Sequence, residues 1–151
     1  MSSTATPPEA ASGAATHWRA LESLYASAPI NQLFTSRLDI PAEGVSRITF
    51  HVEPRAFHAA GALHGTAYFK MLDDAAFYAA NTLVTDRFLL TTAFNLHFSR
   101  PVRGGVLVAE ARLVDEEGEE VGRGTGTFMR SHIALSGLAG YAEALRGDAA
   151  G

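Results

Sequence analysis

The chain has 151 residues, of which 47% are hydrophobic and 19% are charged, enough for one soluble domain with its own core. Its net charge of −4 argues against a nucleic-acid or membrane partner, because both favour a basic surface. The absence of cysteine excludes disulfides, thiolate catalysis and cysteine metal sites. Since the chain has no bilayer-spanning apolar stretch and no secretory signal pattern, we expect a cytoplasmic protein.

The two ends of the chain differ in composition from the rest. Residues 1–15 consist mainly of Ser, Thr, Ala, Pro and Gly without an aromatic side chain, so we expect a disordered tail there. A single domain is then expected over residues 16–146, and residues 147–151 should fray.

A helix and two strands are predicted first along the domain. Apolar side chains at helical spacing indicate a helix over residues 17–28, and Pro29 ends it. Residues 33–40 are expected to form a short strand. Residues 45–53 alternate between apolar and polar side chains, which is typical of a half-buried strand.

Residues 65–83 form the most informative segment. They contain Ala and Leu without proline or an internal glycine, which favours a helix. Apolar side chains cover most of the circumference of this helix, so it must be buried. One sheet wrapped around one central helix meets that requirement.

Four further strands are predicted after this helix, over residues 89–99, 105–114, 119–130 and 132–140. In the third of them, Gly122, Gly124 and Gly126 leave one face without side chains, which permits close approach by another element. Short links between consecutive strands favour antiparallel pairing. The expected fold class is therefore α+β, with an antiparallel sheet wrapped around one long central helix.

The buried helix also carries the candidate chemistry. Gly65 lies at its start, where backbone N–H groups lack helical partners and the helix dipole is positive, which suits a polarised carbonyl oxygen. Asp73 is a carboxylate in an otherwise apolar stretch, so it must be paired, exposed at a cleft or functional. Such a group can act as a general base or a nucleophile toward an activated carbonyl.

The spacing of these two residues has a consequence for assembly. Gly65 and Asp73 are eight residues apart, which is about 12 Å along a helix axis. One carbonyl carbon cannot approach both residues of the same helix. If they share a substrate, Asp73 must come from a second copy of the chain, which predicts a dimer with two equivalent interface sites.

The chain resembles the PaaI-like acyl-CoA thioesterases of the hotdog-fold superfamily in the joint spacing of His64, Gly65, Asp73, Thr91 and Pro101. The resemblance covers about residues 35–141. In the family's pattern, Asp follows the His by nine residues and a Ser or Thr follows the Asp by eighteen, as here. The chain departs from the pattern twice, because His58 stands where the family usually has Asn, and Thr66 replaces a second glycine.

This resemblance implies a hotdog fold that hydrolyses acyl-CoA to free acid and CoA at a dimer interface. The implied catalytic residues are Asp73, Gly65, His58, Thr91 and His64. The Gly65 N–H, with help from His58, would polarise the thioester carbonyl, while the partner's Asp73 would activate water or attack directly. Thr91 would position the water or the carboxylate.

The expected partners also follow from the resemblance. Coenzyme A enters as part of the substrate, with no separate cofactor and no metal, and the assembly is a homodimer or homotetramer. Three cations, Arg100, Arg103 and Arg130, are candidates for binding the nucleotide phosphates.

Other interpretations of these residues stay open. Asp73 and Asp74 could pair with Lys70 on the helix surface, His64 could be structural, and the three arginines could be solvated surface groups. A hydratase or dehydratase is possible on the same fold, although the Asp-x-Asn-Pro-x-His and His-Phe-Pro-Gly-His strings of those enzymes do not occur here.

A non-catalytic protein that binds acyl-CoA or an aromatic ligand is the alternative from another class, favoured by the two departures at His58 and Thr66. The acyl group also stays open. Phe69, Phe77 and Tyr78 could surround an apolar or aromatic acyl chain, but the same rings could belong to the core.

Overall fold

The structure, a computed structural model, describes residues 8–110 and 112–150. Within them the helices are α1 (Pro8–Ser27), α2 (Gly65–Asn81) and α3 (Ala139–Ala150). The strands are β1 (Ser36–Ala42), β2 (Val45–His51), β3 (Arg87–Phe98), β4 (Val106–Ala109), β5 (Leu113–Val114) and β6 (Glu120–Ala134). Short 3₁₀ turns cover Pro29–Gln32, Pro54–Ala56 and Leu135–Gly137. No helix among the described residues is long and apolar enough to cross a membrane.

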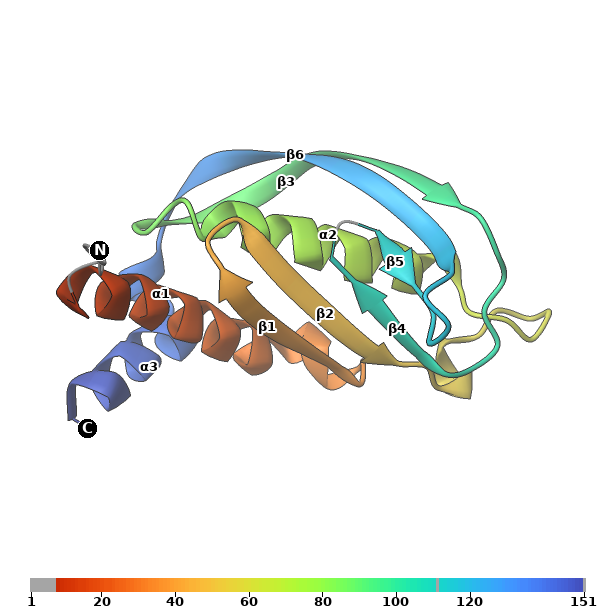
Figure 1. Ribbon diagram of the computed structural model, residues 1–151, viewed down its shortest axis with the longest axis horizontal. Helices are drawn as coiled ribbons and strands as arrows, with labels where there is room; N and C mark the ends of the chain where they lie inside the picture. The colour runs from red at the N-terminus through yellow and green to blue at the C-terminus, as the bar shows by residue number, and fades with distance from the viewer. Residues whose placement is uncertain (1–7, 111, 151) are drawn as a thin grey trace, which may run out of the picture.

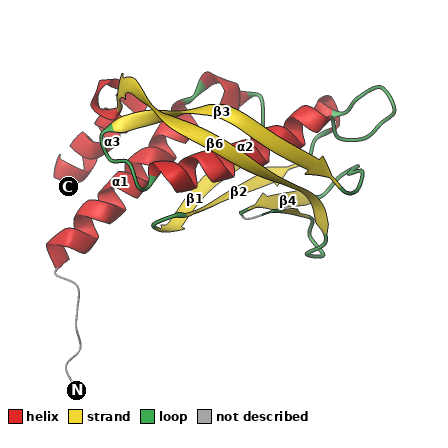
Figure 2. Cartoon of the chain, turned by 90° about the horizontal axis from the view of Figure 1, so that it is seen from above, coloured by secondary structure: helices red, strands yellow, loops and turns green. Residues whose placement is uncertain are grey.

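The strands form one sheet that curves around α2, as the sequence predicts (Figure 1). Its order among the described strands is β1-β2-β4-β5-β6-β3, and every neighbouring pair is antiparallel. Strands β3 and β6 cross over α2 when the molecule is seen from above (Figure 2). The predicted α+β class is therefore confirmed, and β3 occupies one edge of the sheet.

Helix α2 supplies the centre of the core. Its buried side chains include Tyr68, Met71 and Leu72, and Met71 is wholly inaccessible to solvent. They lie in one apolar cluster with sheet residues such as Ile48 and Phe50. Each large apolar side chain buried in this way stabilises the fold by about 1.5–3 kcal/mol. The prediction that this helix is buried is thus confirmed.

The glycine face of β6 receives an aromatic ring from the neighbouring strand. A methyl carbon added at Gly126 would lie 2.8 Å from a ring atom of Phe94, which pairs with Gly126 across the β3–β6 ladder. The Phe94 ring also meets Phe69 of α2 edge-on, with centroids 5.4 Å apart. The close approach predicted from the glycine spacing is therefore made by Phe94.

Both ends of the domain differ from the prediction. Helix α1 begins at Pro8, so residues 8–15 are helical rather than part of a tail, whereas residues 1–7 lie outside the described residues. Proline suits the first turn of a helix, and the alanines that follow favour its continuation. Tertiary packing adds to this propensity, because α1 contributes Leu21 and Tyr25 to the core.

The strand predicted over residues 132–140 is wrong. Strand β6 continues without a break to Ala134, and the chain then turns through Leu135–Gly137 into α3. The buried Tyr141 of α3 joins the core beside α1, so helix docking outweighs the local preference for a strand. The strand predicted over 105–114 is interrupted, because β4 ends at Ala109 and β5 begins at Leu113.

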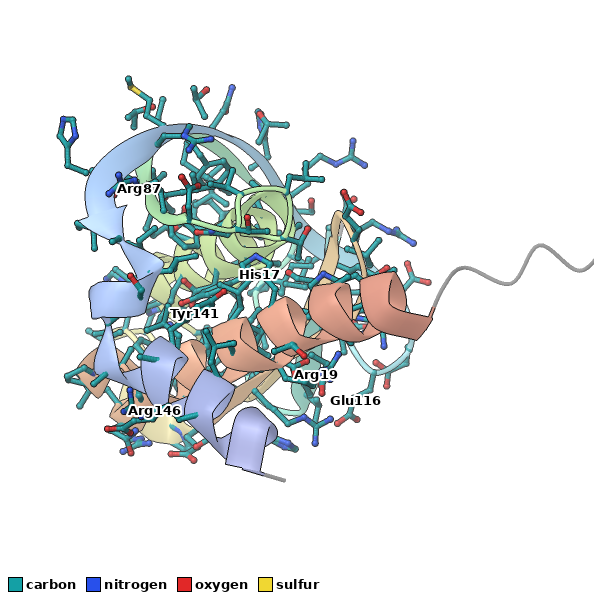
Figure 3. The ribbon with its side chains drawn as sticks, turned by 90° about the vertical axis from the view of Figure 1, so that its left-hand side faces the viewer. His17, Arg19, Arg87, Glu116, Tyr141 and Arg146 are labelled. Carbon is teal, nitrogen blue, oxygen red and sulfur yellow. The ribbon has the colours of Figure 1, made fainter. Side chains whose placement is uncertain are left out.

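A buried histidine connects the helices α1, α2 and α3. The His17 ring lies 2.7 Å through Nδ1 from the hydroxyl of Tyr141 and 2.9 Å through Nε2 from the carbonyl oxygen of Asn81 (Figure 3). The Asn81 side chain in turn accepts the N–H of Leu89 and donates to the carbonyls of Val84 and Arg87. These bonds fasten α1 and α3 to the end of α2 and to the start of β3.

We predict that His17→Ala lowers the free energy of unfolding by about 2–3 kcal/mol, because the buried groups of Tyr141 and Asn81 lose their partner. Denaturant unfolding of the variant and the wild type measures the difference. The matched control is His132→Ala, since His132 is exposed and its loss should change stability by less than about 0.5 kcal/mol. Equal effects of the two substitutions would contradict a structural role for the His17 network.

Candidate active site

His64 caps the amino end of α2. It has extended backbone angles, and its Nδ1 accepts the backbone N–H of Thr66 at 3.1 Å. The Thr66 hydroxyl also lies 2.8 Å from the same nitrogen. Capping satisfies one of the N–H groups that have no helical partner, so the geometry assigns His64 a structural task and leaves Gly65 as the first residue of the helix.

A pocket of about 440 Å³ opens beside this helix end. Its walls come from the loop before α2, the first turn of α2 and the end of β3, and they include His58, Gly65, Tyr68, Phe98, Ser99 and Arg100. The structure thus brings together three candidate site residues, His58, Gly65 and Arg100, and Pro101 of the family's spacing lines the same pocket.

Phe98 closely approaches the glycine at the start of the helix. A methyl carbon at Gly65 would lie 3.1 Å from the Cζ atom of Phe98, which is tighter than an ordinary van der Waals contact. The Phe98 ring also stands edge-on to Tyr68, with centroids 5.0 Å apart, and the Tyr68 hydroxyl donates to the carbonyl of Arg100 at 2.7 Å. These contacts hold the end of β3 against the first turn of α2.

Asp73 lies two turns further along α2, facing β3. Its Oδ1 accepts a hydrogen bond from the hydroxyl of Thr91 at 2.8 Å, so the structure joins two of the predicted site residues. Burial raises the pKa of Asp73 above the ordinary aspartate value, although the Thr91 hydrogen bond and the charge of Lys70 oppose this shift. A raised pKa makes a carboxylate a stronger base.

Lys70 has its ion pair with the neighbouring aspartate instead. Its Nζ atom lies 2.5 Å from Asp74 and 2.5 Å from the side-chain oxygen of Asn31. The same ammonium group stands over the rings of Tyr25 and Phe34. The surface pairing considered for both aspartates therefore holds for Asp74, and Asp73 is the carboxylate left facing β3.

The remaining candidates are dispersed. Arg130 forms two 2.9 Å contacts with the carboxylate of Asp86, and Arg103 lines a separate cavity together with acidic residues such as Glu116. Phe77 and Tyr78 are buried in the core, whereas Phe69 is 39% exposed. The pocket that contains Gly65 does not include Asp73, in agreement with the axial distance expected between them.

Tyr68, Phe98 and Ser99 also line this pocket, although nothing in the sequence marks them as site residues. In the sequence, Phe98 and Ser99 look like ordinary residues at the end of a strand. Tyr68 looks like one more apolar residue of a buried helix. Their position beside Gly65 depends on how β3 crosses α2. The one local signal is the glycine at the helix start, which permits close approach by a neighbour.

The shifted pKa gives a prediction about stability. Because the folded state holds the Asp73 proton more tightly than the unfolded chain does, the carboxylate costs stability once the pH rises above the ordinary aspartate range. We therefore predict that Asp73→Asn raises the free energy of unfolding at neutral pH and that this gain disappears in acid. Denaturant unfolding at both pH values measures it.

Asp39→Asn is the control, since Asp39 forms a surface pair with Arg37 and its loss should have little effect at either pH. A lower stability of Asp73→Asn at neutral pH would show instead that the Asp73 carboxylate serves the fold.

Comparison with known proteins finds a family match over the segment that holds the candidate site. Residues 60–118 match the thioesterase superfamily, and that segment contains the helix start, Asp73 and Thr91. The PaaI protein from the phenylacetic acid degradation operon of E. coli superposes with a TM-score of 0.71 at 19% identity, covering 80% of this chain and 97% of that one.

Two further solved structures are similar. A mutant of the phenylacetic acid degradation protein PaaI from Thermus thermophilus has a TM-score of 0.62 at 21% identity, with 69% of this chain and 100% of that one covered. A thioesterase of Haemophilus influenzae has a TM-score of 0.66 at 17% identity, with 76% and 93% covered. No curated protein matches the chain by sequence. The chain therefore has the hotdog fold, and its predicted resemblance to the PaaI-like thioesterases of that superfamily is confirmed.

Proposed function

We propose that this protein hydrolyses acyl-CoA thioesters to a free acid and CoA, at sites that two copies of the chain form together. The observation that carries the proposal is Asp73, a half-buried carboxylate with a raised pKa that is hydrogen-bonded to Thr91. It lies on the same helix whose amino end opens into a pocket at Gly65. The match to the thioesterase superfamily supports thioester hydrolysis in general, and the acyl-CoA substrate belongs to the proposal.

The requirement for two copies comes from distance. Gly65 and Asp73 are separated by about 12 Å along α2, so each site takes the helix start of one protomer and the carboxylate of the other. Strand β3 is 12 residues long and ends the described sheet order. Antiparallel pairing of β3 with the partner's β3 would satisfy its outer backbone groups and set the two α2 helices antiparallel.

The reaction then follows from the two groups that form the site, the Gly65 N–H and the Asp73 carboxylate. The Gly65 N–H binds the thioester carbonyl oxygen and polarises the carbon–oxygen bond. Asp73 of the other protomer takes a proton from water while the water oxygen bonds to the carbonyl carbon. The carbon–sulfur bond breaks as the tetrahedral intermediate collapses, and Asp73 returns the proton to the CoA thiolate. Direct attack by the Asp73 carboxylate is the covalent version of the same step.

Two other residues complete the assignment. Thr91 donates to one oxygen of Asp73, which orients the carboxylate and leaves its second oxygen for the water. Arg100 is the arginine that lines the Gly65 pocket, so among the three candidates it is the best placed for a CoA phosphate. Arg130, already paired with Asp86, would have to exchange that partner.

A protein that only binds acyl-CoA is the second candidate, because Thr66 and His58 depart from the family's pattern at the helix start. The two functions separate in one assay. A thiol reagent detects CoA released by an esterase, whereas a binder would retain acyl-CoA in equilibrium dialysis without releasing thiol.

We predict that Asp73→Asn lowers kcat by at least about 10²-fold, the scale of a positioned general base, across a panel of short, long and aromatic acyl-CoA substrates. Thiol release under saturating substrate measures the effect. Asp39→Asn serves as the control, because it removes an exposed carboxylate outside the site and should keep wild-type activity. Full activity of Asp73→Asn would remove Asp73 from the mechanism.

A second prediction tests the shared site. Gly65→Pro removes the N–H at the first helical position, where proline is tolerated, and His64 before it already has the extended backbone that proline requires. Gly65→Ala is the matched control, because it also adds a side chain near Phe98 but keeps the N–H. We expect Gly65→Pro to lose about 10²–10³-fold in kcat and Gly65→Ala to lose less.

Co-expression of Gly65→Pro with Asp73→Asn should then restore activity. In a mixed dimer one site carries both defects, and the other carries neither, so the purified heterodimer is expected to show about half the wild-type rate. If the heterodimer stays as inactive as the two parents, Gly65 and Asp73 do not act across subunits.

A further inference from the structure

A second cavity, of about 480 Å³, lies between the helices α1 and α3 and the end of the sheet where β3 begins. Its walls come from the end of α1, from α2 and β3, and from the segment that enters α3, with Leu24, Tyr78, Phe88 and Leu138 among them. None of its described lining residues lines the pocket at Gly65. Its volume falls in the range of cavities that hold small molecules, so it is a candidate site distinct from the one proposed above.

The shape of this cavity is set by the contact between α1 and α3, which lie side by side (Figure 1). A methyl carbon added at Gly140 of α3 would collide with the side chain of Ser27 at the end of α1. The hydrogen bond between Tyr141 and His17 joins the same two helices. The walls are therefore held in place without a ligand.

The Tyr78 hydroxyl opens into this cavity without a partner. Tyr78 is only 6% exposed, and its ring meets those of Tyr25 and Phe77 edge-on. Its hydroxyl forms no hydrogen bond with a described residue, whereas every fully buried side-chain oxygen or nitrogen of the described residues has a partner. The hydroxyl must then be an exposed atom of this side chain, and Tyr78 lines the cavity. Since a hydroxyl in such surroundings gains from a hydrogen bond, it is a point where a ligand can be held.

The charge at the cavity selects among ligands. Glu143 is the one charged residue among the described lining residues, and it is exposed. No ion pair between described residues includes it. A carboxylate or a phosphate would therefore meet only a like charge here, whereas an ammonium group would gain a partner. The free acid and the CoA phosphates of the proposed reaction do not suit this cavity.

We propose that this cavity is a binding site for an aromatic amine that carries a second polar group on its ring. The ring lies among apolar walls that include Leu24, Phe88 and Leu138. The polar group on the ring hydrogen-bonds with the Tyr78 hydroxyl, and the ammonium group pairs with Glu143 at the exposed mouth. The site does not depend on the proposed thioesterase function, because it lies apart from the Gly65 pocket.

Three ligands of nearly equal shape test the two polar contacts. Tyramine has both groups, phenethylamine lacks the ring hydroxyl, and phloretic acid has a carboxylate in place of the ammonium group. Titration of each into ¹⁵N-labelled full-length protein gives a Kd from the shifts of backbone signals, with Gly140 expected among those that move. We expect tyramine to bind most tightly and phloretic acid most weakly.

Tyr78→Phe tests the inner contact. It removes only a hydroxyl that has no partner among the described residues, so the melting temperature should stay close to that of the wild type. We expect the Kd of tyramine to rise about five- to tenfold, the scale of one hydrogen bond. The Kd of phenethylamine, which cannot make this bond, should stay within about twofold of the wild-type value.

Glu143→Gln tests the contact at the mouth. The Kd of tyramine should rise about two- to fivefold, the scale of an exposed ion pair, and the preference for tyramine over phloretic acid should largely disappear. Both effects should shrink in high salt. Glu43→Gln is the matched control, because it removes an exposed carboxylate at the turn between β1 and β2, outside the cavity, and should leave every Kd unchanged.

Three results would overturn the inference. The first is that none of the three ligands moves the signals of the cavity, and the second is that phloretic acid binds more tightly than tyramine. The third is a Kd of tyramine that stays unchanged in Tyr78→Phe or in Glu143→Gln, because the ligand then lacks one of the two contacts. Thiol release from acyl-CoA is measured separately, and its failure would leave this site unaffected.

Discussion

The burial of one helix is the constraint on which the rest of this structure depends. Helix α2 is apolar around most of its circumference, and a sheet alone can cover it only by curving around it. Any carboxylate on such a helix is partly desolvated, and burial disfavours the charged form. The raised pKa of Asp73 is therefore a consequence of the same packing that stabilises the fold.

Two adjacent aspartates meet this constraint in different ways. Successive residues point about 100° apart on a helix, so Asp74 faces Lys70, while Asp73 faces Thr91 of β3. Asp74 is neutralised by an ammonium group, whereas Asp73 receives the neutral hydroxyl of Thr91. Burial raises the pKa of both carboxylates, but an ammonium group occupies Asp74, whereas the partner of Asp73 is a hydroxyl. Their partners differ because the two side chains point in different directions.

The periodicity of apolar residues predicted the elements that have one regular apolar face. It failed where packing against distant parts of the chain determines the secondary structure. The alternation of β2 and β3 and the apolar surface of α2 each follow from the sequence within a few residues. Residues 132–140 contain several apolar side chains that fit a separate strand, yet β6 ends at Ala134 and α3 begins at Ala139, because Tyr141 of α3 reaches His17 and the core. Residues 8–15 likewise lie in α1, which contributes Leu21 and Tyr25 to the core.

For the candidate site, the sequence by itself determined the spacing of Gly65 and Asp73, from which the shared site is proposed. Gly65 and Asp73 share one helix, and the rise of that helix separates them whatever surrounds it. Only the tertiary structure decided what lies beside each of them. The crossing of β3 over α2 places Thr91 against Asp73 and Phe98 against Gly65. Those contacts join residues 18 and 33 positions apart, and no periodicity in a sequence encodes where two such segments meet.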